Sequence, residues 1–169
     1  MTEGEFHIDM SKKFKDEVNV GIACCSFDKI EHRGCAFNGN LVKKLHNQFC
    51  NSNKKSKDGN AKLYAVSIYC LIKEILPKIE TLVICCDESP SLTKKYLLEI
   101  INNNIETQEI EIISIREYRI RIGDPKIKSM AHNLCNIYRK KAPKCWRHKK
   151  GIPLNVIEIG FNELKEILN

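Results

Sequence analysis

Two adjacent acids, Asp87 and Glu88, follow the apolar run TLVICC at residues 81–86 and directly precede Ser89-Pro90. Such a run is typical of a strand covered on both faces, and Ser-Pro is typical of a helix start. Ligands of open α/β sheets bind at the carboxyl ends of such strands, where carboxylates can hold Mg²⁺ or Mn²⁺. The helix dipole alone would also favour acids here. The candidate catalytic acids are Asp87, as the magnesium or manganese ligand, with Glu88, Asp28 and Asp124.

A second set of residues has the chemistry of zinc ligands. His132 and Cys135 are three residues apart, as are Cys145 and His148. Residues three apart lie side by side on a helix, and two Cys with two His complete a four-coordinate zinc site. The spacing matches no standard zinc finger, and a chance pairing of Cys with His is expected in a chain with nine cysteines. A partly buried Cys135 among surface residues of a basic loop is the simpler alternative.

Positive charge is concentrated in residues 116–150. This block holds twelve Lys or Arg and two acids, a balance of +10, whereas the whole chain has 28 basic and 21 acidic residues and a net charge of +7. The helix dipole explains basic residues at a helix C-terminus but not the arginines before the helix or the cationic loop after it. The residues expected to contact nucleic acid are Arg116, Arg119, Arg121, Arg139, Lys140, Lys144, Trp146, Arg147, Lys149 and Lys150.

A local field of this kind most often meets a polyanion. Trp146, in the predicted loop, offers a surface on which an unpaired base could stack. An acidic protein partner or an acidic membrane surface is the alternative to nucleic acid.

Size and composition predict one compact domain over residues 1–169, with 43% hydrophobic and 29% charged residues. No apolar run approaches the ~20 residues that span a bilayer. The polar N-terminus does not resemble a signal peptide, so a cytoplasmic location is expected. The cysteines are then reduced, and six lie in apolar stretches as small buried hydrophobic residues. These six are Cys24, Cys25, Cys35, Cys70, Cys85 and Cys86.

The elements that must position these residues begin with two strands at 18–25 and 30–37, joined tightly enough to form an antiparallel hairpin. A helix at 40–50, a mobile loop at 51–60 and a helix at 61–76 that ends at Pro77 follow. The strand at 81–86 is followed by a helix from Ser89-Pro90 to 102–104 and by a strand at 109–115. The stretch REYRIRI either extends this strand or forms a further one. The last predicted elements are a helix opened by Asp124-Pro125, a strand at 155–159 and a helix at 162–168.

The late helix has a predicted apolar stripe formed by Ile127, Met130, Ala131, Leu134, Ile137 and Tyr138. Residues 1–17 are a candidate disordered segment, 18–141 the core, and 142–169 a basic loop with the last strand and helix. Strands separated by helices pair in parallel, and the hairpin adds antiparallel strands. The expected fold class is therefore α/β, a mixed sheet with an opening antiparallel hairpin and helices on its faces.

The hairpin, the helix after it, the strand that ends in Asp87-Glu88-Ser89 and the late amphipathic helix together resemble a ribonuclease H-like fold over residues 18–141. The order of elements is also similar to that of small uncharacterised archaeal proteins of that group.

The resemblance implies two divalent ions held by acids on the first strand, the helix after the hairpin, the end of the next strand and the last helix. Asp87 matches the third position. Cys24 and Cys25 stand where the first acid is expected, with Asp28 a few residues later, and Glu74 lies late in its helix. Two-metal chemistry needs ligands that place two ions ~3.5–4 Å apart. The resemblance thus implies an altered or incomplete metal site.

Three functions are compatible with these patterns. The first is nucleic-acid binding on a ribonuclease H-like fold with an incomplete metal site. The second is a divalent-metal nuclease that uses Asp87. The third is a non-catalytic module that binds an acidic protein partner, in one version stabilised by zinc.

Overall fold

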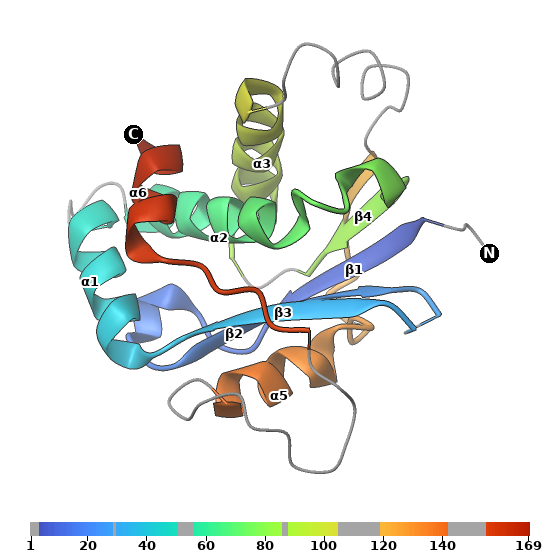
Figure 1. Cartoon of the computed structure of the whole chain (residues 1–169), viewed down its shortest axis with the longest axis horizontal. Helices are drawn as coiled ribbons and strands as arrows, with labels where there is room; N and C mark the ends of the chain where they lie inside the picture. The colour runs from blue at the N-terminus through green and yellow to red at the C-terminus, as the bar shows by residue number, and fades with distance from the viewer. Residues whose placement is uncertain (1–3, 29, 51–55, 86–87, 105–118, 142–154) are drawn as a thin grey trace.

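The computed structural model describes residues 4–28, 30–50, 56–85, 88–104, 119–141 and 155–169, with only the backbone given for Ser56, Arg119 and Lys141. Five strands form one mixed sheet in the order β3-β2-β1-β4-β5 (Figure 1). The strands are β1 (Glu5–Met10), β2 (Val20–Ser26), β3 (His32–Phe37), β4 (Thr81–Ile84) and β5 (Arg119–Ile122). The predicted α/β class and mixed sheet are confirmed.

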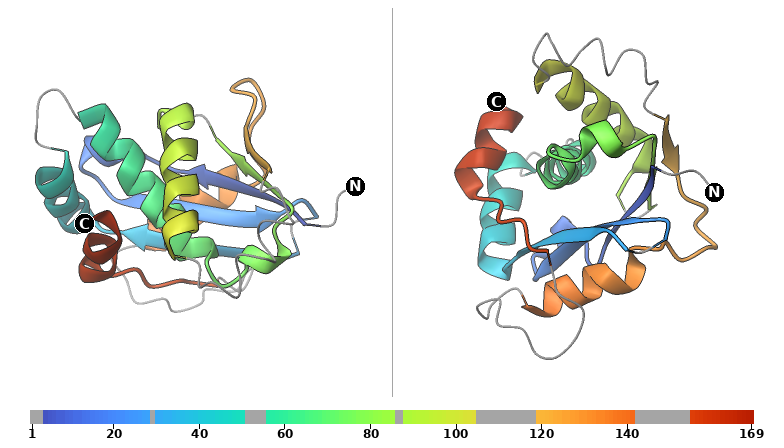
Figure 2. Two further views of the ribbon diagram at one scale, coloured as in Figure 1. Left: turned by 90° about the horizontal axis from the view of Figure 1, so that it is seen from above. Right: turned by 45° about the vertical axis from the view of Figure 1, so that its right-hand side comes forward.

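Helices lie on both sides of this sheet. On one side are α1 (Gly39–Phe49), α2 (Ser56–Ile72), α3 (Pro90–Asn104) and α6 (Phe161–Leu168), and on the other side is α5 (His132–Lys141). Figure 2 shows the sheet between these two layers. Two short 3-10 helices, η1 (Phe14–Asp16) and η2 (Leu76–Lys78), complete the described elements.

The central strand is β1, which pairs antiparallel with β2 and parallel with β4. Its side chains alternate, so Phe6, Ile8 and Met10 face the larger helical layer and are at most 4% exposed. The sequence predicted a candidate disordered segment at residues 1–17 and a core from residue 18, whereas the structure has a core strand at residues 5–10 and a short helix at residues 14–16. The polar residues that suggested a solvated segment lie on the opposite face of the same strand, where Asp9 is buried.

The predicted hairpin is confirmed, since β2 and β3 pair antiparallel from Val20↔Phe37 to Cys25↔His32. The parallel pairing of strands separated by helices is also confirmed, for β1 with β4 and for β4 with β5. The predicted helices at 40–50, from Ser89-Pro90 to 102–104 and at 162–168 correspond to α1, α3 and α6. Of the predicted buried cysteines, Cys24, Cys25, Cys35 and Cys70 are at most 2% exposed, Cys85 is half-buried and Cys86 is outside the described residues.

The late helix begins later than predicted. Asp124 does not open it but closes a turn, because its Oδ1 accepts the Lys126 N–H at 2.8 Å. The helix α5 starts at His132. Ile127 and Ile137, predicted on the apolar stripe, are 70% and 37% exposed. The buried stripe is instead formed by Ala131, Leu134, Cys135 and Tyr138, which pack on β2 and β3.

Three smaller predictions also change. Residues 56–60 of the predicted loop at 51–60 belong to α2, and residues 51–55 lie outside the described residues. The predicted strand at 155–159 is reduced to a single parallel bridge between Val156 and Gly34. The predicted strand at 109–115 lies outside the described residues, and only β5 is described from the stretch REYRIRI.

Candidate functional site

The candidate site begins with Asp9, near the carboxyl end of the central strand. Its side chain is 3% exposed, and its Oδ1 accepts the Met10 backbone N–H at 2.7 Å. A buried carboxylate is costly unless hydrogen bonds or opposite charges compensate it. Its Oδ2 therefore has a second partner, His132, whose Nδ1 lies 3.0 Å away.

His132 is the first residue of α5, and its side chain is 40% exposed. The hydrogen bond through Nδ1 leaves Nε2 as the ring nitrogen available to a ligand or water. The pair therefore joins a buried carboxylate to an imidazole that reaches the surface. Such a pair can coordinate a divalent cation or orient the imidazole as a proton acceptor.

Two glycines let α5 come close enough to form this pair. A Cβ at Gly21 on β2 would lie 2.2 Å from the Cys135 carbonyl oxygen and 2.5 Å from the Arg139 nitrogen. A Cβ at Gly34 on β3 would lie 2.4 Å from the Tyr138 ring. The absence of side chains at these positions allows the helix backbone to rest on the sheet.

Asp9 lies at the edge where the parallel strands end. The Cys85 N–H donates to the Ile8 carbonyl oxygen at 3.0 Å, and the Gly123 N–H donates to the Ile84 carbonyl oxygen at 2.8 Å. The carboxyl ends of β1, β4 and β5 thus meet at one edge, as expected for a ligand site in an open sheet. Asp124 follows β5 at this edge and is exposed. Asp87 follows β4 in the sequence but lies outside the described residues.

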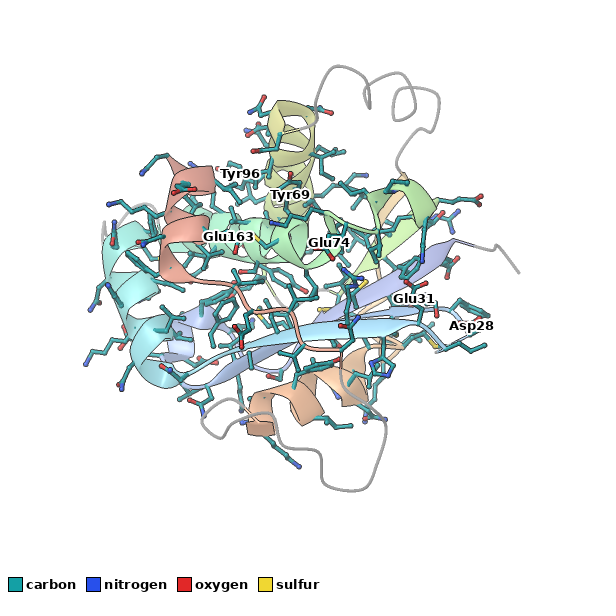
Figure 3. The ribbon with its side chains drawn as sticks, in the orientation of Figure 1. Asp28, Glu31, Tyr69, Glu74, Tyr96 and Glu163 are labelled. Carbon is teal, nitrogen blue, oxygen red and sulfur yellow. The ribbon has the colours of Figure 1, made fainter. Side chains whose placement is uncertain are left out.

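The predicted acid Asp28 is not part of this edge. It lies in the turn between β2 and β3, where the adjacent Phe27 N–H donates to the Glu5 carbonyl oxygen at the amino end of β1. Figure 3 shows Asp28 with Glu31 at the tip of this hairpin. Asp28 accepts hydrogen bonds from the Ser26 hydroxyl and the Ile30 N–H, which lower its pKa. Asp28 lies at the opposite end of the hairpin from Asp9 because β2 runs antiparallel to β1.

Glu88 and Glu74 also lie apart from the Asp9–His132 pair. Glu88 is 6% exposed. The pKa of the Cys50 thiol, which lies at the end of α1, is raised to about 11, mainly by burial and then by the charge of Glu88. Glu88 therefore faces the larger helical layer. Glu74 lies 3.5 Å from Arg33 on β3, and its side chain is 69% exposed.

The described residues contain no group of three or more His, Cys, Asp or Glu placed to hold a metal ion. Asp9 and His132 supply two such groups, and Mg²⁺ and Mn²⁺ sites often use one or two carboxylates together with substrate phosphates. The donors of this pair therefore fit a divalent cation that shares its coordination with a phosphate.

Half of the predicted zinc set, Cys145 and His148, lies outside the described residues. In the other half, His132 is bonded to Asp9, and the buried Cys135 thiol donates to the His132 carbonyl oxygen at 3.0 Å. The described half thus binds protein groups and presents no thiol to a surface ligand.

The predicted basic surface is described in part. Arg121 and Lys140 are exposed, and Arg139 is half-buried. For Arg119 only the backbone is described, as an edge-strand residue of β5. The remaining predicted contacts, Arg116, Lys144, Trp146, Arg147, Lys149 and Lys150, lie outside the described residues.

Sequence reasoning missed Asp9 and a second basic group just beyond it. Lys12, Lys13 and Lys15 line an open hollow together with Met10, Ser11 and Asp16. The missed signal was the alternation of Phe6, Ile8 and Met10, a period of two that is typical of a strand.

Comparison of the chain with protein-family models, with curated proteins and with solved structures found no match. In the described residues, no helix has both the length and the apolar character required to cross a membrane.

Proposed function

We propose that this protein binds nucleic acid at the carboxyl edge of its parallel strands and cleaves it in a divalent-metal-dependent reaction, on a ribonuclease H-like fold. The observation that carries the proposal is the Asp9–His132 pair, a buried carboxylate 3.0 Å from a surface imidazole. Exposed basic residues, Arg121 among them, lie on the flanking segments and favour a polyanionic ligand.

The pair changes what the resemblance to ribonuclease H-like proteins implies. The resemblance implies an acid on the first strand, and the sequence alone suggested that Cys24 and Cys25 occupy that position. The first strand is β1, and in this proposal Asp9 on β1 is that acid. His132 lies on the helix that precedes the basic residues 144–150 in the sequence, and Asp87 remains the ligand predicted at the end of β4. These placements support the nuclease over a binding protein with an empty site.

In this proposal the available Nε2 of His132 and the Asp87 carboxylate would hold the cation, and Asp9 orients the imidazole and adds its negative charge. A bound Mg²⁺ or Mn²⁺ would stabilise the charge that develops on the phosphate during hydrolysis. The protein groups orient the site, because the Met10 N–H fixes one carboxylate oxygen and α5 fixes the imidazole. The surrounding lysines and arginines hold the nucleic acid backbone.

The test compares Asp9→Asn with Asp28→Asn. Asn retains the shape of Asp9 and can still accept the Met10 N–H, but it has no charge for a cation. We expect Asp9→Asn to lose about a hundredfold or more of the cleavage rate in Mn²⁺, with salt-dependent DNA or RNA binding retained. Asp28→Asn, an equal charge change at the far end of the hairpin, should cleave as the parent does.

Calorimetric titration with Mn²⁺ gives a readout that is independent of cleavage. The parent and Asp28→Asn should bind Mn²⁺, and Asp9→Asn should bind it at least about tenfold more weakly. Equal cleavage rates for Asp9→Asn and the parent contradict the nuclease proposal. Binding that is absent at low salt, or that does not change with salt, contradicts nucleic acid as the ligand.

A further inference from the structure

We infer that the hollow at the end of β1, lined by Met10, Ser11, Lys12, Lys13, Lys15 and Asp16, binds the phosphodiester backbone of the nucleic acid next to the point where the same chain reaches Asp9 and His132. This inference rests on the proposed function and adds to it the place where the backbone is held. The basic block at 116–150, from which nucleic-acid binding was predicted, does not contain these lysines.

Charge is the first argument. The hollow has three lysines against one acid, Asp16, and one Asp16 oxygen accepts the Lys13 backbone N–H at 3.2 Å. In the described part of the chain no ion pair involves these three lysines. Lysines elsewhere do have partners: Lys73 lies 2.8 Å from Glu163, and Lys78 lies 3.2 Å from Glu31. Three ammonium groups that the described residues do not pair with an acid favour a ligand with negative charge.

The backbone of the hollow is held in place before any ligand binds. Ser11 exchanges two hydrogen bonds with Gly21, its N–H donating to the Gly21 carbonyl oxygen and its Oγ accepting the Gly21 N–H, both at 2.9 Å. The Ser11 hydroxyl proton can then be donated to a phosphate oxygen. Phe14, which is fully buried against Phe37, anchors the segment between Lys13 and Lys15. The lysines therefore extend from a fixed segment.

The hollow is next to the Asp9–His132 pair along the chain. Met10 lines the hollow, and its N–H is the donor to Asp9. Lys12 is three residues beyond Asp9, which corresponds to at most about 10 Å of chain. A single phosphate in the hollow would not extend to Asp9, whereas a chain of phosphodiesters would pass it. The negative charge of Asp9 repels such a chain unless a cation lies between them. The lysines of the hollow therefore provide the attraction for the phosphates near Asp9.

The experiment compares two triple variants with the parent. Lys12→Gln, Lys13→Gln and Lys15→Gln together remove the positive charges of the hollow. Lys43→Gln, Lys57→Gln and Lys165→Gln together remove the same charge from exposed positions on α1, α2 and α6 that do not line the hollow. The affinity for a duplex DNA, a single-stranded DNA and an RNA oligonucleotide is measured at several salt concentrations.

For the hollow variant we expect at least about tenfold weaker binding at low salt, and a salt slope smaller by about 0.9 per lysine on duplex DNA, or about 0.7 on a single strand. The control variant should keep most of the slope of the parent. Acetylation footprinting of the parent should show Lys12, Lys13 and Lys15 protected by the oligonucleotide, and Lys43 and Lys165 labelled as in the free protein.

The outcomes separate this inference from the proposed function. If the parent binds nucleic acid and the hollow variant has the same affinity and slope, the inference is wrong and the proposed function remains. If the parent binds no nucleic acid, both are wrong. Binding of inorganic phosphate, a mononucleotide and phosphatidylserine vesicles is measured in the same way. If the hollow variant binds one of these more weakly than the parent but binds the oligonucleotides equally well, the ligand of the hollow is not a nucleic acid backbone and the inference is overturned.

Discussion

Asp9 combines burial with charge, and this combination explains why its two partners matter. A carboxylate that is 3% exposed has lost most of its hydration, so the Met10 N–H and the His132 imidazole must replace it. The imidazole is only half-buried, so it connects this interior carboxylate to the surface. A cation or a water molecule at the surface would therefore interact with Asp9 through the exposed side of this pair.

Replacement of His132 by Ala should destabilise the fold. The change removes the His132 hydrogen bond to a buried carboxylate oxygen, and the loss of such a bond costs about 1–3 kcal/mol. Exposure of His132 brings the expected loss toward the lower end of that range. The free energy of unfolding in urea measures it. Asn133→Ala, a change at the exposed neighbouring position, should cost less than about 0.5 kcal/mol, and an equal loss in both variants would contradict a specific role for the pair.

At the scale of elements, the site depends on how closely α5 lies on β2. The helix has only a short apolar stripe, since Ile137 is exposed, and the buried residues at this contact include the small Cys135 and Ala131, which directly precedes the helix. Small side chains on the helix and Gly21 and Gly34 on the sheet bring the two backbones together. This approach places the first residue of α5, His132, beside Asp9.

Gly21→Ala should separate these elements. The new Cβ would meet the Cys135 carbonyl oxygen at 2.2 Å, and a backbone atom cannot move without moving the helix. We expect a loss of about 1–3 kcal/mol in the free energy of unfolding, together with a changed NMR signal for the His132 ring as it leaves Asp9. Gly39→Ala is the matched control, because its nearest atom would lie 3.4 Å away at the start of α1. The control should leave both measurements nearly unchanged, and a similar loss in both variants would refute the argument.

The elements also show what the sequence can and cannot reveal. The hairpin and α3 were predictable because local signals define them, a period-two pattern in one case and Ser89-Pro90 in the other. β1 was missed because its polar residues resemble those of a solvated segment unless the sheet that buries them is known. The start of α5 was misplaced because Asp124 forms a turn, and the same Asx hydrogen bond can begin either a turn or a helix.

For the whole molecule, the candidate site could not be assembled from the sequence because its two members lie 123 positions apart. Pairing of β1 between β2 and β4 places Asp9 at the centre of the sheet, and packing of α5 supplies His132. The burial of cysteines, by contrast, followed from their apolar neighbours in the sequence. Cys24 and Cys35 are at most 1% exposed in the larger core. Because these thiols cannot ionise easily while buried, the stability of the whole fold should depend on pH in the alkaline range.

Stability should fall at alkaline pH because several buried thiols resist ionisation. Burial raises the pKa of Cys24 and Cys35, and it raises the pKa of Cys50 to about 11 and that of Cys70 to about 12. An unfolded thiol has a pKa of about 8.5, so the unfolded chain releases these protons first. Stability is then fully present below about pH 8 and declines as the pH rises toward the folded pKa values, by up to about 1.4 kcal/mol per pH unit for each thiol.

Urea unfolding under reducing conditions between pH 7.5 and 10.5 measures this decline, and Cys70→Ala isolates one thiol. That variant should be less stable than the parent at pH 7.5, since it loses buried sulfur, yet its stability should fall less steeply with pH, by up to about 1.4 kcal/mol per unit. Ser67→Ala is the control, because this buried residue lies on the same helix and does not titrate. It should shift the stability equally at every pH. If Cys70→Ala instead declines as steeply as the parent, the Cys70 thiol is ionised in the folded protein and its burial does not hold the proton.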